Sequence, residues 1–284
     1  MTINASSSAA SDAAAISSQR VAAHARIDVA FRHGRSRLAR LYQDGAAKIR
    51  LPGTRSDPLE AVLINMAGGL TGGDRLGWEV GIGDGARCVI TTQACEKVYR
   101  ALAGHAQVDV NLSVGKGGFL GWLPQETIVY DRAAFSRRLD ADLAARAEAL
   151  IVEATIFGRS AMGERAVHGS FRDRWRISYE GRLVHGEDFF VGPDIETTFA
   201  RPASTGGRIA MATLLLISDR SEVLVEPARR IIGDDGGVST WNVAGTGKLL
   251  ARLYAEDGYE LRKRLAPLVE LLNGQAGLPR LWSL

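Results

Sequence analysis

Apolar and polar residues alternate in short segments along most of this chain, and residues with turn propensity separate the segments. The clearest example is residues 106–114, where Val108, Val110, Leu112 and Val114 occupy every second position. A period of two places these side chains on one face of a β-strand and the intervening polar side chains on the other. Further segments of alternating or β-branched character span residues 26–32, 36–43, 59–65, 76–82, 87–93 and 127–143. The pattern therefore predicts a mainly β protein with strands buried on one face.

Helical periodicity is confined to a few segments. Residues 259–272 carry leucines at positions 261, 265, 268 and 272, a spacing that predicts an amphipathic helix. Residues 221–232 predict a second helix with Ser221 as its N-cap, although Pro227 lies in its middle. Residues 148–158 form an apolar run that is too continuous for periodicity to distinguish a short buried helix from a strand.

The order of these segments favours a single domain. Strands and helices do not alternate regularly, which disfavours a parallel, doubly wound sheet of the Rossmann type. No repeat of fixed period and no Pro- or Ser-rich linker divides residues 24–284. Residues 1–23 form a Ser- and Ala-rich tail, which we expect to be disordered and which lacks the continuous apolar block of a secretory signal. We therefore expect one elongated β-rich domain with a few flanking helices.

Composition narrows the class of protein further. The 35 Lys and Arg residues nearly balance the 32 Asp and Glu residues, and no basic stripe appears, so nucleic-acid binding is disfavoured. No segment reaches the roughly 18 uninterrupted apolar residues of a transmembrane helix, which argues against a membrane protein. Cys88 and Cys95 do not form a C-x-x-C pair, which argues against a disulfide framework and a structural zinc site. These features predict a soluble cytoplasmic protein.

Two segments resemble catalytic motifs but lack residues that those motifs require. Residues 242–250 resemble a phosphate-binding loop, but Asn242 replaces its first glycine and Leu249 replaces its Ser or Thr, so a tight turn between two strands is the better interpretation. Ser160 lacks the second glycine of a nucleophile elbow, because Met162 stands there. The histidines never occur at two- or four-residue spacing, so no local metal cage is indicated, and for His168 we expect a hydrogen bond in a turn.

Two acidic residues stand out by their context. Asp74 follows the glycine pairs 68–69 and 72–73, where its carboxylate can cap the loop. Glu153 lies inside the apolar run ALIVEATIF, where an unpaired carboxylate pays a large desolvation cost. It must therefore find an arginine, a proton, water or a metal ion. A buried ion pair is the structural interpretation, and a polar passage lined by acids is the functional one.

Several motifs occur in the order of a known family. They are GG-x-x-GGD at residues 68–74, TTQ at 91–93, KVYR at 97–100, WLPQETIVY at 122–130, FGRSAMGE at 157–164, HGSFRDRW at 168–175 and LPRLW at 278–282. Together they closely resemble the UreD (UreH) family of urease accessory proteins. The resemblance spans roughly residues 24–284, and an ordered set of motifs is far more specific than one glycine loop.

The resemblance implies a fold, a function and partners. It implies stacked sheets with a β-helix-like body, and a maturation factor that is not itself an enzyme. Such a factor acts with UreF and the GTPase UreG on urease apoprotein, so that nickel reaches the buried active site. It implies no tightly bound cofactor, only Ni²⁺ in transit. Acids at the positions of Asp74 and Glu153 are thought to serve this transit, and Glu187 is the nearest match to a third acid, although the segment LVHGEDFF departs from the usual pattern.

Other positions and other functions also fit the sequence. Thr92, Gln93, Lys97 and Tyr99 are candidates for shaping the same passage. An enzyme acting on a small polar substrate could use Asp74 or Glu153 as general acid or base, and this predicts a single pocket with converging groups. A conduit predicts a continuous polar channel that opens at a partner surface, whereas a plain β-rich interaction module predicts neither.

Overall fold

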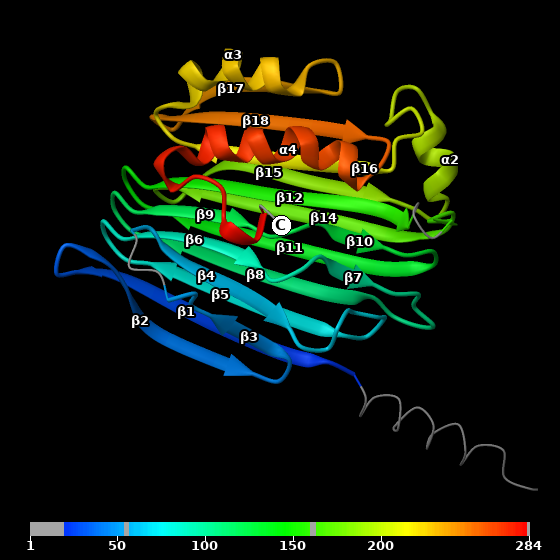
Figure 1. The fold of residues 1–284 in the computed structure, drawn as a ribbon, viewed down its shortest axis with the longest axis horizontal. Helices are drawn as coiled ribbons and strands as arrows, with labels where there is room; N and C mark the ends of the chain where they lie inside the picture. Colours follow the sequence, from blue (N-terminus) through cyan, green and yellow to red (C-terminus); the bar gives the residue numbers. More distant parts are fainter. Residues whose placement is uncertain (1–19, 54–56, 160–162, 283–284) are drawn as a thin grey trace, which may run out of the picture.

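Two β-sheets stacked face to face form the body of the protein (Figure 1). The structure is a computed structural model that describes residues 20–53, 57–159 and 163–282. Ser160 and residues 1–19 of the expected tail lie outside the described residues. Ala22 and Ala23, which the sequence assigned to the tail, are instead the first residues of strand β1.

Within the described residues, the first sheet has seven strands and the second has eleven. The first runs in the order β15 (Arg182–Val191), β14 (Gly169–Tyr179), β11 (Ala133–Leu143), β8 (Ala106–Val114), β5 (Arg75–Ile82), β1 (Ala22–Arg32) and β2 (Arg35–Asp44). The second runs β17 (Gly236–Val243), β18 (Thr246–Ala255), β16 (Ala210–Ile217), β12 (Glu148–Arg159), β9 (Phe119–Leu123), β6 (Arg87–Thr92), β4 (Leu59–Asn65) and β3 (Ala47–Arg50). The short strands β7 (Glu96–Val98), β10 (Thr127–Val129) and β13 (Glu164–Arg165) attach to it.

The central part of the chain winds back and forth between the two sheets. Strands β5, β8, β11 and β14 are parallel neighbours in the first sheet, and β4, β6, β9 and β12 are parallel neighbours in the second. Because consecutive long strands belong to opposite sheets, each turn of the winding adds one strand to each sheet. This solenoid-like arrangement confirms the predicted mainly β, β-helix-like fold.

The core lies between the sheets and is built by the predicted alternation. In β8 every second residue is buried and the others are exposed, as the period of two requires. Residues 148–158, which the sequence left open, belong to strand β12. Their continuous apolar run has a physical cause: one face of β12 packs on the first sheet, and the other lies under helices, so both faces are buried.

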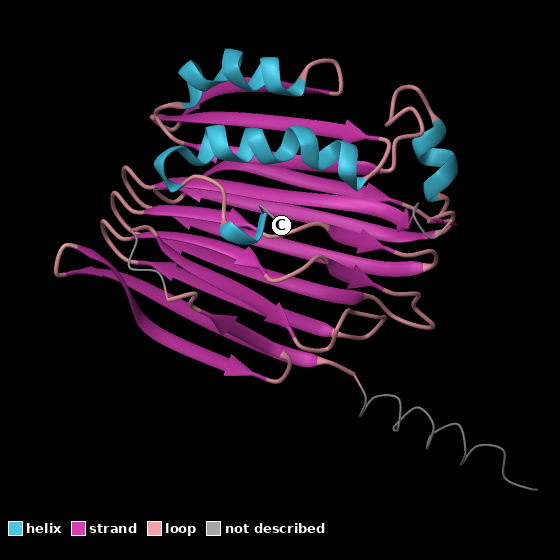
Figure 2. Ribbon diagram, viewed as in Figure 1, coloured by secondary structure: helices cyan, strands magenta, loops and turns pink. Residues whose placement is uncertain are grey.

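Helices cover the outer face of the second sheet (Figure 2). The predicted helices are confirmed as α3 (Ser221–Ile232), with Pro227 inside it, and α4 (Gly258–Asn273). The expected N-cap is wrong, because Ser221 is the first residue of α3 and Arg220 occupies the cap position. The four leucines of α4 that carry the helical spacing are all buried. The sequence did not predict the short helix α2 (Ile195–Ala200), which lies at one end of the strands. No helix in the described part of the chain is long and apolar enough to cross a membrane.

The segment that resembles a phosphate-binding loop is a β-hairpin. Strands β17 and β18 pair antiparallel, and Ala244 and Gly245 connect them. Both connecting residues have positive φ, 52° and 80°, as expected for a two-residue hairpin turn that matches the twist of its strands. The prediction of a tight turn between two strands is therefore confirmed.

Candidate functional site

Asp74 closes the glycine loop between β4 and β5, and main-chain groups bind its carboxylate. Its Oδ1 accepts a hydrogen bond from the amide of Val21 at 2.9 Å, and its Oδ2 accepts one from the amide of Thr71 at 2.7 Å. Only 4% of Asp74 is exposed. These contacts tie the start of β1 to the loop, so the capping role that the sequence suggested is present.

The family motifs around this loop line a pocket of their own. Its volume is about 350 Å³, and Gly68, Gly69, Thr92, Gln93 and Lys97 are among its walls. Neither Glu153 nor Glu187 lines it. The passage that these motif residues were expected to share with the buried acids is therefore not visible as one cavity in the described residues.

Glu153 lies on β12 with its side chain directed between the sheets, where only 5% of the residue is exposed. Its Oε1 accepts a hydrogen bond from Nε1 of Trp122 at 2.9 Å. Its Oε2 forms an ion pair with the buried guanidinium of Arg137 on β11. Glu153 thus has the arginine partner that its apolar surroundings require.

Arg137 is shared between two acids. Its Nε and Nη2 donate to the two carboxylate oxygens of Asp173 on β14, at 3.0 and 2.5 Å, in a bidentate pair. Trp175 donates from Nε1 to the same carboxylate at 3.1 Å. Arg137 and Asp173 face each other because β11 and β14 pair in parallel with these residues in register. One buried cation therefore serves two buried carboxylates, which leaves the cluster with one excess negative charge when both acids are ionised.

This excess charge affects the protonation of Glu153. Burial raises the pKa of Glu153 to about 7, and the neighbouring Asp173 raises it too, while Arg137 and the Trp122 hydrogen bond act in the opposite direction. A carboxyl group with such a pKa gains and loses its proton near neutral pH. The sequence identified Glu153 as an acid in need of a partner, but it did not identify Arg137 or Asp173.

Glu153 and Glu187 line the same small cavity between the sheets. The cavity also has Asp173 in its wall and a volume of about 20 Å³, which is room for about one water molecule. Glu187 faces it because β15 pairs with β14 in a register that sets Glu187 beside Trp175. The structure thus brings two of the three predicted acids together, whereas Asp74 does not line this cavity.

Glu187 connects the cavity to a more exposed region. Its carboxylate accepts hydrogen bonds from Nη2 of Arg252 at 2.6 and 2.7 Å, and 43% of the Arg252 side chain is exposed. His185 lies 3.6 Å from the same carboxylate and is itself buried. Although burial opposes it, the nearby His185 and the hydrogen bonds and charge of Arg252 lower the pKa of Glu187. Glu187 is therefore ionised over a wider pH range than Glu153.

The polar side chains between the sheets follow the registers of the strands. In the second sheet, Glu153 pairs with Thr213 and Thr213 pairs with Arg252 across three neighbouring strands. In the first sheet, Asp173 and Glu187 lie on the facing surface. We call Glu153, Asp173, Glu187, Thr213 and Arg252 the polar seam. It runs from the buried Arg137 toward the edge of the sheets, but in this structure it is not an open channel.

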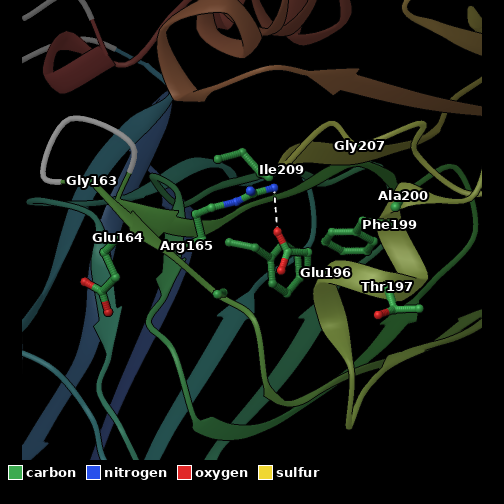
Figure 3. Close-up of a pocket in the computed structure, with 11 residues that line it drawn as sticks. Gly163, Glu164, Arg165, Glu196, Thr197, Phe199, Ala200, Gly207 and Ile209 are labelled. Atoms are coloured by element: carbon green, nitrogen blue, oxygen red, sulfur yellow. Dashed lines mark ion pairs between the residues drawn. The ribbon is translucent and has the colours of Figure 1, made fainter.

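A much larger cavity lies elsewhere, beside α2 at the end of β12 (Figure 3). It measures about 720 Å³, and its walls include the rings of Phe157 and Phe199. Arg165 and Glu196 form an ion pair across it at 2.6 Å. Neither Asp74 nor Glu153 reaches this cavity, so these acids do not converge there as the general acid or base of an enzyme.

The remaining candidate ligands are dispersed. Within residues 20–53, 57–159 and 163–282, no three His, Cys, Asp or Glu side chains form a group that could hold a metal ion. His168 forms an isolated antiparallel β-bridge with Asp194 rather than lying in the expected turn. Its Nδ1 is 3.1 Å from Oδ1 of Asp194, which agrees with the expected hydrogen bond. The polar seam could therefore give a metal ion only a few oxygen contacts at a time.

Comparison with known proteins identifies the family. The family model described as UreD urease accessory protein matches residues 21–283. The urease accessory protein UreD of Mesorhizobium japonicum is 65% identical over 266 residues, which cover 94% of this chain and 95% of that protein. Urease accessory protein UreD 1 of Brucella abortus is 54% identical over 269 residues, covering 95% and 96% of the two chains. The chain therefore belongs to the UreD family of urease accessory proteins, which are accessory factors rather than enzymes.

Proposed function

We propose that this chain supports urease maturation by passing Ni²⁺ along the polar seam to urease apoprotein, in a complex with UreF and UreG. The observation that carries the proposal is that Glu153 and Glu187, two acids separated by 34 positions, line one cavity between the sheets. Family membership supports the role in maturation, and the nickel path and the named partners are what the proposal adds.

The chemistry of the polar seam suits passage rather than storage. Carboxylate oxygens bind Ni²⁺ less tightly than sites built from imidazole or thiolate groups. Arg137 already forms ion pairs with both Glu153 and Asp173, so a cation entering the cavity must compete with a guanidinium. A metal ion binds the deprotonated carboxylate, and the raised pKa of Glu153 lets that group exchange a proton for the ion near neutral pH.

Asp74 has a different place in the proposal. Direct contact of its carboxylate with Ni²⁺ would compete with the hydrogen bonds from Val21 and Thr71. We therefore assign direct contact with nickel to Glu153 and Glu187, and assign Asp74 to holding the glycine loop in place. The cavity of about 20 Å³ must widen during transfer, and docking of UreF or urease apoprotein would supply that change. GTP hydrolysis belongs to UreG, because this chain has an incomplete phosphate-binding motif.

The test is to express urease with its accessory proteins in cells that contain or lack this chain, and to measure nickel per urease and urease activity. The decisive variant is Glu153→Gln with Glu187→Gln, which keeps the side-chain volumes and removes two negative charges. We expect it to fold and to bind UreF while lowering nickel loading severalfold. Asp188→Asn is the matched control, because Asp188 is adjacent in sequence but exposed and paired with Arg172.

The outcomes separate the candidate functions. Nickel loading that requires the chain but is unchanged by the double variant would remove the polar seam from the mechanism and leave an interaction module. Equal loading with and without the chain would overturn the maturation role itself. A loss that Asp188→Asn reproduces would show a general effect of surface charge rather than a path through the seam.

A further inference from the structure

Strand β2 forms one edge of the seven-stranded sheet and exposes apolar side chains there. Among the residues that the structure describes, β2 pairs only with β1. The exposed fractions of Leu38, Leu41 and Tyr42 are 39%, 38% and 48%. An edge strand offers unpaired backbone N–H and C=O groups, and proteins usually protect such edges with charges or cover them. An edge that also exposes leucines is suited to pairing with another strand.

The open part of this edge begins after Ser36. The amide of Ser36 donates to Asp57 at 3.1 Å, and its hydroxyl accepts from the amide of Arg87 at 2.8 Å, so this residue is already engaged. Residues 37–44 have no strand on their outer side within the described parts of the chain. Nε of Arg37 has no hydrogen-bond partner there either.

A β-bulge gives this edge an unusual symmetry. Val29 pairs with Leu38 and Asp28 pairs with Arg40, so Ala39 has no partner in β1. As a result Leu38 and Leu41, which are three residues apart, both lie on the inner face, opposite Val29 and Ile27. Arg37 and Tyr42 both lie on the outer face by the same register. Residues at equal distances on either side of a point between residues 39 and 40 therefore lie on the same face of the sheet.

We infer that a second copy of this chain pairs antiparallel with β2 about a two-fold axis between residues 39 and 40. In that register each residue i faces residue 79 − i of the other copy, so within the open part of the edge Leu38 faces Leu41 and Arg37 faces Tyr42. Each pair joins side chains from the same face, as an antiparallel ladder demands. Without the bulge, Leu38 and Leu41 would lie on opposite faces and this register would be impossible.

The charges of β2 select this register. A register centred on residue 38 would place Leu38 opposite Leu38 of the other copy, and one centred on residue 39 would place Leu38 opposite Arg40. A register centred between residues 38 and 39 would place Arg37 opposite Arg40, and such a pair of like charges is destabilising. In the inferred register the Arg37 guanidinium of each copy meets the Tyr42 ring of the other, at both ends of the open segment. Arg40 lies near the axis, and each copy places its own Asp28 opposite Arg40 on the same face.

The assembly joins two seven-stranded sheets into one continuous sheet. The contact is small beside the roughly 1,200–2,000 Å² of stable interfaces, because one strand from each copy forms it. We therefore expect a reversible dimer whose population rises with protein concentration. The contact is isologous and closes on itself, so it leads to a dimer and not to a fibre.

Sedimentation velocity of the full chain at about 1 to 100 µM tests the surface. We expect the mean mass to rise toward that of a dimer, and the Leu38→Lys, Leu41→Lys double variant to remain a monomer. Leu183→Lys is the matched control, because Leu183 is 59% exposed on β15, the opposite edge strand of the same sheet. Circular dichroism of each variant verifies that it is folded. A parent chain that stays monomeric throughout overturns the proposal, and so does a dimer that only Leu183→Lys disrupts.

Cysteine cross-linking tests the register independently. The Arg37→Cys, Tyr42→Cys double variant should form an intermolecular disulfide under mild oxidation, because residues 37 and 42 of the two copies face each other. Each single variant and the parent chain, with its buried Cys88 and half-buried Cys95, serve as background. A dimer in which the double variant links no faster than the single variants would overturn the inferred register.

Discussion

At the scale of single residues, the Arg137 guanidinium balances two buried carboxylates, Glu153 and Asp173. Replacing it with an apolar side chain, as in Arg137→Met, leaves both acids buried without a cation. We expect the free energy of unfolding to fall by about 3–5 kcal/mol at pH 8. Urea denaturation measures this change.

The neighbouring arginine provides the control for this prediction. Arg138 lies on the opposite face of β11, where 60% of its side chain is exposed and it pairs with Asp140. Arg138→Met should change the free energy of unfolding by less than about 1 kcal/mol, because exposed ion pairs contribute little. Similar losses from the two substitutions would contradict a special role for the shared guanidinium.

The protonation of Glu153 makes stability depend on pH. Its pKa is raised from 4.5 to about 7 in the folded chain, so between these values the folded state binds more protons than the unfolded state. The free energy of unfolding should therefore fall as the pH rises through this window, by roughly 1–3 kcal/mol. Glu153→Gln should remove this part of the pH dependence, which urea denaturation at pH 5 and pH 8 would measure.

The pKa shift of Glu187 has the opposite direction to that of Glu153, so its effect on the pH dependence of stability is also opposite. Its pKa is lowered in the folded chain, so its contribution to stability is present above its unfolded pKa and is lost as the pH falls through the folded value. Glu187→Gln should therefore reduce stability at pH 8 and weaken the loss of stability in acid. Identical pH profiles for the two variants would show that neither assigned environment governs the titration.

The sequence shows which of these residues point inward more clearly than it shows their partners. Phe135, Arg137 and Leu139 alternate on one strand, and the period of two is a signal from which the inward position of Arg137 could have been found. Asp173 holds the same position between Phe171 and Trp175. The contact between Arg137 and Asp173 depends on β11 lying beside β14 in register, and periodicity within one strand carries no information about its neighbours.

At the scale of elements, the glycine loop depends on backbone geometry that only glycine adopts easily. Gly69 has a φ of 144°, and a Cβ there would overlap the ring of Tyr99. Gly69→Ala should lower the free energy of unfolding by about 2 kcal/mol or more. Gly68 has a φ of 75° and open space around it, so Gly68→Ala should cost about 1 kcal/mol.

Amide hydrogen exchange would show whether the loss of stability in Gly69→Ala arises in the glycine loop. The amides of Val21 and Thr71 donate to Asp74, so Gly69→Ala should speed their exchange more than Gly68→Ala does. Equal exchange in both variants would mean that the loop does not depend on Gly69 for its shape.

Long helices and strands with a clear period were predicted correctly from the sequence, whereas short elements and elements buried on both faces were not. The long amphipathic helix α4 and the alternating strand β8 have several turns or pleats that repeat one signal. Helix α2 has six residues, too few to establish a helical period. Strand β12 could not be assigned because burial on both faces removes the alternation that marks a strand.

At the scale of the whole molecule, the C-terminus fastens the helical layer to the second sheet. Trp282, in the short helix η3 (Arg280–Trp282), is 4% exposed, and its Nε1 lies 3.1 Å from both Oγ1 of Thr91 and the carbonyl oxygen of Leu123. The guanidinium of Arg262 on α4 stacks over its ring, 5.3 Å from the ring centroid. One side chain thus joins α4, β6 and β9.

Because of these contacts, Trp282→Ala should lower the free energy of unfolding by about 3–5 kcal/mol. Trp241 is the matched control, because it is 48% exposed and its replacement by Ala should cost about 1 kcal/mol or less. The sheets and the helical layer share β9 and β12 between their two core clusters, so the loss should appear as one cooperative transition. Far-UV circular dichroism and tryptophan fluorescence should then report the same midpoint in Trp282→Ala. Separate midpoints would show that the helical layer unfolds independently of the solenoid, and that the C-terminus does not fasten the two into one folding unit.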